Sequence, residues 1–252
     1  YKAMLLVERL TYFFAKHAIV TNESYKEIAI KRGKKSPENV TIVRSGPDLS
    51  KLKVGAPKPE VKNGFNFLVG YIGVMGKQEG IDLLLQSIDY IVKEKKREDI
   101  RFCLMGGGPA LEELRELNQK LGLEKFVEFP GRVSNEYLAD ILNTADVCVN
   151  PDVPSEMNDK STMNKIMEYM AFGKPIVQYT LKEGMFSAKQ ASLYAKNTDT
   201  IDFAEKILWL LEHPNEAQEM GVFGRNRVEK ELCWEFEKPK LISAYKKILN
   251  LD

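Results

Sequence analysis

The sequence lacks the residue clusters on which several classes of protein depend. It has two histidines and three cysteines, with no Cys-x-x-Cys pair and no His-Glu-x-x-His motif, so a zinc site of those kinds is excluded. Cys103, Cys148 and Cys233 lie far apart within apolar segments, and we expect them to be reduced core residues of a cytosolic protein. Because there is no run of eighteen apolar residues and no cleavable signal pattern, we expect a cytoplasmic chain that does not span a membrane.

A strong excess of one charge is also lacking. The 37 Lys and Arg residues nearly balance the 36 Asp and Glu residues, which leaves a net charge of +1. Nucleic acid is therefore not an expected partner, because proteins bind its phosphates through a basic excess. The 252 residues are 44% hydrophobic, which is typical of a globular protein with one large or two modest domains.

The first sixty residues differ in pattern from the rest. Apolar residues recur at helical spacing over residues 3–17, and two short apolar runs indicate strands at 18–20 and 40–43. A polar run with several prolines follows and indicates a linker. We therefore expect residues 1–60 to be the terminal part of one domain with its linker, and residues 61–252 to form a second domain.

Short apolar strands and amphipathic helices alternate regularly after residue 65. The expected strands are Phe67–Ile72, Arg101–Met105, Val127–Phe129, Val147–Asn150, Ile176–Tyr179 and Ser192–Ala195. Such alternation predicts right-handed crossovers and a parallel sheet with helices on both faces. The fold class is therefore α/β, with a Rossmann-like doubly wound sheet, and the last fifty residues are expected to be helical with their apolar positions in the core.

Two glycine-rich turns follow the first two of these strands. Gly73, Gly76 and Gly80 let the backbone approach a phosphate closely, although their spacing is neither a dinucleotide fingerprint nor a Walker A loop. The turn at residues 106–108 is followed by Glu112 and Glu113, whose charges would repel a phosphate. We interpret this second turn as structural.

The most informative stretch follows the strand that ends at Asn150. Asp159 or Ser161 is expected to cap a helix there. The backbone N–H groups at the start of that helix would then be free to bind an anion; they belong to Thr162, Met163 and Asn164.

Side chains in the same stretch suit a nucleoside diphosphate. Lys160 and the hydroxyls of Ser161 and Thr162 supply donors for a diphosphate. Glu168, about two turns along the helix, would accept hydrogen bonds from ribose hydroxyls. Spacing alone favours a capped helix with an exposed Glu168 over such a site.

Five motifs in order resemble the C-terminal domain of the group 1 (family 4) retaining glycosyltransferases of GT-B architecture. They are YIGVMGKQEGID (71–82), MGGGP (105–109), FPGRV (129–133), ADVCVNP (145–151) and NDKSTMNKIMEYMAFGKPIV (158–177). Residues 1–60, with TNES (21–24) and VRSGPD (43–48), look like the last part of that family's N-terminal, acceptor-side domain.

The resemblance implies a donor site for a nucleotide diphosphate sugar, a UDP-sugar above all. Glu168 matches the second glutamate of the family's E-x7-E motif, which holds the ribose, and the backbone around Arg132 and Val133 would meet the base. The diphosphate and sugar would face the remaining expected donor-binding residues: Gly73, Gly76, Asp159, Lys160, Ser161, Thr162, Met163 and Asn164. The resemblance implies no cofactor or metal, and no residue can be named as a general base.

The sequence departs from the family pattern at two places. The first glutamate of E-x7-E falls on Lys160. The usual arginine and lysine after the first strand fall on Val74 and Glu79. We expect Lys160 to replace the lost cation.

The function that the resemblance implies is transfer of a hexosyl group, with retention, to a glycan or lipid-linked acceptor in polysaccharide biosynthesis. A lipid-linked acceptor would bring the protein to the inner face of a membrane as a peripheral protein. Because the earlier part of the acceptor-side domain is lacking from the sequence, we expect the chain alone to bind nucleotide without transferring sugar. Two alternatives stay open, a nucleotide-sugar epimerase and a non-catalytic nucleotide-binding module.

Overall fold

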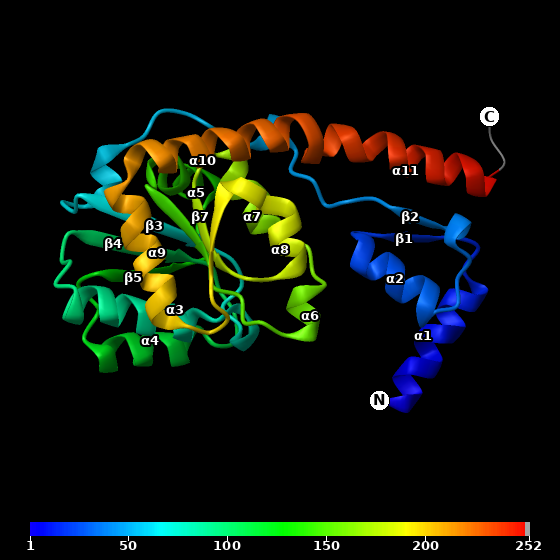
Figure 1. Ribbon diagram of the computed structural model, residues 1–252, viewed down its shortest axis with the longest axis horizontal. Helices are drawn as coiled ribbons and strands as arrows, with labels where there is room; N and C mark the ends of the chain where they lie inside the picture. Colours follow the sequence, from blue (N-terminus) through cyan, green and yellow to red (C-terminus); the bar gives the residue numbers. More distant parts are fainter. Residues whose placement is uncertain (250–252) are drawn as a thin grey trace.

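The computed structural model describes residues 1–249 and contains two parallel sheets of unequal size (Figure 1). The smaller sheet belongs to what we call the N-terminal unit: α1 (Lys2–Phe14), β1 (Ala18–Val20), α2 (Glu23–Lys31) and β2 (Val40–Ile42). Asn22 begins α2 as its N-cap, since its side chain accepts a hydrogen bond from the Tyr25 backbone N–H. No residue of α1 is buried.

The larger sheet has six parallel strands in the order β5-β4-β3-β6-β7-β8. They are β3 (Phe67–Ile72), β4 (Ile100–Met105), β5 (Val127–Gly131), β6 (Val147–Asn150), β7 (Ile176–Tyr179) and β8 (Ser192–Ala195). The six predicted strands and the doubly wound α/β fold are thus confirmed. The direction of winding reverses between β3 and β6, so the carboxyl ends of these two strands open the crevice where such sheets bind ligands.

Helices cover both faces of the larger sheet (Figure 1). They are α3 (Ile81–Asp89), α4 (Leu111–Leu121), α5 (Asn135–Thr144), α6 (Glu156–Asp159), α7 (Asn164–Ala171), α8 (Lys182–Ala188), α9 (Thr200–Glu212), α10 (Pro214–Arg227) and α11 (Trp234–Leu249). Two π-helical turns, Tyr90–Glu94 and Val228–Leu232, follow α3 and α10. No helix in the described part of the chain combines the length and the apolar character that crossing a membrane requires.

The strands divide the core into two layers because alternate side chains point to opposite faces. Val149 and Val177 belong to the layer beneath α3 and α9, whereas Cys148 and Ile176 belong to the layer beneath α7. All three cysteines are free and buried, as predicted.

Helix α11 returns from the larger sheet to the N-terminal unit, where it packs near β2 (Figure 1). The outgoing and returning segments meet where the Trp234 N–H donates to the Pro47 carbonyl at 3.1 Å. Gly46 is required there, because a Cβ atom at this position would lie 2.2 Å from the Leu232 carbonyl oxygen. The proposed domain boundary at residue 60 stays a prediction, and residues 250–252 of the predicted second domain lie outside the described residues.

Two local predictions were wrong. Neither Asp159 nor Ser161 caps α7, which begins at Asn164 after Met163 with no side-chain cap. A separate short helix, α6, precedes it and is capped by Ser155, so Asp159 is the last residue of α6. The Asp159 carboxylate accepts a hydrogen bond from the Lys182 N–H at the start of α8. Tyr245, expected in the core, is 54% exposed on α11.

Candidate functional site

A buried charged cluster closes one side of the crevice between β3 and β6. Lys165, in the first turn of α7, lies 2.6 Å from the Glu79 carboxylate and 2.8 Å from the Asp152 carboxylate. Its ammonium group also lies over the Tyr71 ring, 4.9 Å from the centroid. We call these four residues the Lys165 cluster; it ties α7 to the loops that follow β3 and β6.

Burial and ion pairing set the protonation of this cluster. Burial raises the pKa of Asp152 to about 7, even though Lys165 opposes the shift, and one of its oxygens has no hydrogen-bond partner in the described chain. Burial also acts to raise the pKa of Glu79, but the ion pair with Lys165 outweighs it and the pKa falls below its usual value. The pKa values of the two carboxylates beside this one cation are therefore shifted in opposite directions.

The loop between α6 and α7, residues 160–163, carries four of the predicted donor-binding residues. The Ser161 hydroxyl donates to the Met157 carbonyl at 2.7 Å, so its single hydrogen is already used. Thr162 Oγ1 accepts a hydrogen bond from Asn22 at 2.9 Å, which leaves its own hydrogen for another acceptor. Lys160 pairs with Glu156 at 2.6 Å, and this contact shares its charge.

The backbone at the start of α7 keeps unpaired donors. Within residues 1–249, the N–H groups of Thr162, Met163 and Asn164 have no intramolecular acceptor. The positive end of the helix dipole lies at the same place. This is the arrangement predicted for a diphosphate, although the helix starts later than expected.

Glu168 lies three residues after Lys165 on α7, beside a pocket of about 370 Å³. We call it the Glu168 pocket; it is lined by Ser45, Gly46, Pro47, Asp48, Lys51, Asn164, Glu168 and Trp234. Its walls come from α7, the segment after β2 and the start of α11. Burial raises the pKa of the Glu168 carboxyl, which has no hydrogen-bond or ion-pair partner among the described residues. Glu168 is thus half-buried, whereas spacing alone favoured an exposed position.

The two glycine-rich turns pack against each other. The Gly73 N–H donates to the Met105 carbonyl, and a Cβ atom at Gly106 would lie 1.7 Å from the Gly73 carbonyl oxygen. Gly106 also has a φ of +144°, which favours glycine. These contacts support a structural role for the turn at 106–108.

The predicted base-binding residues lie farther along the sheet, after β5. The Arg132 side chain runs alongside Gly107, at 3.3 Å from the position of a Cβ atom there. Val133 packs against the core layer beneath α7. Arg132 thus contacts the turn after β4, whereas Lys165 of α7 contacts Glu79 in the loop after β3.

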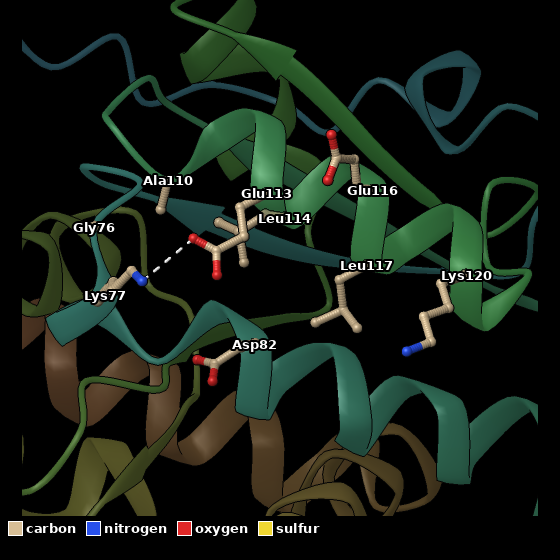
Figure 2. Close-up of a pocket in the computed structure, with 9 residues that line it drawn as sticks. All are labelled: Gly76, Lys77, Asp82, Ala110, Glu113, Leu114, Glu116, Leu117 and Lys120. Atoms are coloured by element: carbon tan, nitrogen blue, oxygen red, sulfur yellow. Dashed lines mark ion pairs between the residues drawn. The ribbon is translucent and has the colours of Figure 1, made fainter.

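A second cavity, of about 420 Å³, lies between α3 and α4 (Figure 2). Leu114 and Leu117 form its apolar floor, and Lys77 and Glu113 form an ion pair of 3.5 Å at its rim. Gly76 is its one sequence-predicted residue. This cavity shares no lining residue with the Glu168 pocket, so the predicted donor residues do not converge on it.

The sequence analysis did not identify several residues that form the Lys165 cluster, contact the predicted donor-binding residues or line the Glu168 pocket. Asp152 directly follows β6 at the point where the winding reverses, which is a signal that the sequence carried. Lys165, Trp234, Asn22 and Tyr25 carried no comparable signal, because each meets the site only through the tertiary fold.

Comparison with known proteins identifies the family. The family model of the glycosyl transferases group 1 matches residues 66–213, which is more than half of the chain. The D-rhamnosyltransferase WbpZ of Pseudomonas aeruginosa is 27% identical over 73% of this chain and 47% of its own length. The capsular polysaccharide biosynthesis glycosyltransferase CapM of Staphylococcus aureus is 23% identical over 99% of this chain and 66% of its own length.

Solved structures agree on the fold. Anabaena HepE, crystallised with UDP and glucose, superimposes with a TM-score of 0.81 at 16% identity, over 96% of this chain and 66% of HepE. The chain spans about half the length of the first curated relatives that it matches. None of these relatives favours an epimerase or a non-catalytic module. The protein therefore belongs to the group 1 glycosyltransferases and has the α/β fold of their GT-B architecture.

Proposed function

We propose that this chain is the donor-binding part of an enzyme that transfers a hexosyl group from a nucleotide diphosphate sugar, with retention, to a glycan or lipid-linked acceptor. A UDP-sugar is the proposed donor. The proposed location is the cytoplasm, with peripheral association at the inner face of a membrane when the acceptor is lipid-linked.

The observation that carries this proposal is that one helix, α7, has both N–H groups without an acceptor and a carboxylate without a partner among the described residues. The N–H of Asn164 and the carboxyl of Glu168 are four residues apart on α7, a rise of about 6 Å. A nucleoside diphosphate presents an anion and a pair of ribose hydroxyls in succession. One helix thus offers donors for the first and an acceptor for the second.

The same helix start suits the chemistry of transfer. Negative charge grows on the leaving diphosphate while the sugar becomes oxocarbenium-like, so fixed donors stabilise the transition state. A single well-placed donor contributes about 3 kcal/mol in oxyanion-type sites. The N–H groups of residues 162–164 and the Thr162 hydroxyl are such donors, and Lys160 adds a cation when its pair with Glu156 opens.

Related proteins support the choice of ligand. HepE was crystallised with UDP and glucose, and the names of WbpZ and CapM refer to sugar transfer and to polysaccharide biosynthesis.

Calorimetric titration with UDP and with pyrophosphate tests the proposal. We expect the wild-type chain to bind both, and Glu168→Ala to weaken UDP about tenfold with little change for pyrophosphate. Glu216→Ala, which changes an exposed glutamate on α10, is the matched control and should leave UDP affinity within about twofold. Absence of heat with folded protein at millimolar UDP would contradict the proposal, as would an equal loss for both ligands.

A further inference from the structure

The first turn of α2, in the N-terminal unit, contacts the 160–162 loop of the larger unit. Asn22 is fully buried, and its Nδ2 donates to the Lys160 carbonyl and to Thr162 Oγ1, both at 2.9 Å. The orientation of this amide is fixed, because its Oδ1 accepts from the Tyr25 N–H at 2.8 Å. Both Nδ2 hydrogens of Asn22 are therefore used to hold the loop.

Tyr25 holds the residue between these two. Its hydroxyl lies 3.0 Å from Ser161 Oγ. Since the only hydrogen of Ser161 is donated to Met157, Tyr25 must be the donor of this bond. Three consecutive loop residues thus each accept a hydrogen bond from α2 or its cap.

These contacts decide which loop hydroxyl can serve a ligand. The Ser161 hydroxyl already donates its hydrogen to the Met157 carbonyl. Thr162 only accepts from Asn22, and no acceptor for its hydrogen occurs within residues 1–249. Asn22 thereby leaves the Thr162 hydroxyl as a free donor beside the unpaired N–H groups at the start of α7.

We infer that Asn22 and Tyr25 are positioning residues for anion binding: they fix the 160–162 loop so that the Thr162 hydroxyl and the N–H groups of 162–164 converge on the diphosphate of a bound nucleotide. This inference rests on the proposed function for its ligand. The part of the inference that concerns the loop is independent of that ligand, because the contacts are present in the protein alone.

Asn22→Ser is the test variant. Serine caps helices about as well as asparagine, but its shorter side chain does not reach the loop. Ser24→Ala is the matched control, because Ser24 donates to the buried Glu183 at 2.7 Å in the same interface without touching residues 160–162. Tyr25→Phe removes the second loop contact alone.

Two measurements distinguish an effect on the 160–162 loop from an effect on ligand binding. The first is hydrogen exchange, without ligand, of the Lys160 and Ser161 amides, which are bonded to Met157 and Asn158. We expect exchange to be at least about tenfold faster in Asn22→Ser and unchanged in Ser24→Ala. The second is calorimetric affinity for UDP and pyrophosphate, which should weaken about tenfold for both ligands in Asn22→Ser and about threefold in Tyr25→Phe.

A double variant tests the route of the effect. On a Thr162→Val background, Asn22→Ser should weaken pyrophosphate binding by less than about threefold further, because the two changes remove one shared arrangement. Unchanged loop exchange in Asn22→Ser, or equal loss of affinity in Asn22→Ser and Ser24→Ala, would overturn the inference. Wild-type protein that binds neither UDP nor pyrophosphate would overturn the proposed function, and the exchange rates would still decide whether Asn22 and Tyr25 hold the loop.

Discussion

Two charged residues of α7, Lys165 and Glu168, satisfy their charges in different ways. Lys165 is enclosed by Glu79 and Asp152, with 10% of its side chain exposed. Glu168, three residues later, faces a pocket with no partner among the described residues. A buried charge that is fully paired fixes structure, whereas a half-buried carboxylate without a partner is kept at a cost in desolvation. The Lys165 cluster therefore stabilises the start of α7, and the Glu168 pocket is where we propose that a ligand binds.

Removing the cation should produce the largest effect. Lys165→Met leaves two carboxylates facing each other without a cation, so we expect the free energy of unfolding to fall by about 3 to 5 kcal/mol. Urea denaturation at pH 7 measures this loss. Lys182→Met, an exposed lysine on α8, is the control. A loss below about 1 kcal/mol for Lys165→Met would remove the distinction between Lys165 and Glu168.

The pH dependence of stability should report Asp152. Its pKa is about 7 in the folded protein and about 4 when unfolded, so the folded state binds more protons between these values. Stability should therefore decline as the pH rises from 4 to 7. The side-chain amide of the variant Asp152→Asn cannot ionise, so this variant should lose most of the decline, which amounts to about 3 kcal/mol between pH 4 and 7. Parallel curves of unfolding free energy for the two proteins from pH 5 to 8 would contradict this assignment.

Nucleotide affinity should depend on pH through Glu168. Burial raises the pKa of Glu168, and the ionised carboxylate is the better acceptor for ribose hydroxyls. UDP should therefore bind more tightly as the pH rises through this raised pKa, by up to about tenfold. Calorimetry should show this trend in the wild type and a flat profile in Glu168→Gln. The same slope in both proteins would assign the titration to another group.

Glu168→Gln should have the smallest effect on stability. The carboxylate has no partner to leave unpaired, and an uncharged amide is less costly to bury. We expect the free energy of unfolding at pH 7 to change by less than about 1 kcal/mol or to rise slightly. A large loss of stability in urea denaturation would show that Glu168 is structural, like Lys165.

The sequence was most informative about elements with strong local patterns. The six strands of the larger sheet were predicted within two residues at each end, since each is a short apolar run between polar turns. Helix α8, seven residues long, was not predicted because Gly184 and Ser187 interrupt its apolar pattern. The start of α7 was misplaced, since Asp159 and Ser161 are good capping residues whose oxygens are used elsewhere.

The site was predictable only where one segment carries it. Residues 159–168 are contiguous, so their types and spacing could be read together. The Lys165 cluster joins residues from β3, its following loop, the end of β6 and α7, and only the fold brings them together. Asn22 could be recognised as a helix cap, but its donation to a loop 138 residues away could not.

The contact between Pro47 and Trp234 has a topological consequence. The chain enters the larger body and leaves it at adjacent points, 3.1 Å apart at the hydrogen bond, and α11 then rejoins β2. The two segments that join the larger body to the N-terminal unit are therefore neighbours in space. The two ends of the larger body are close enough to be joined by a short linker, so this geometry suits excision or circular permutation of residues 47–234.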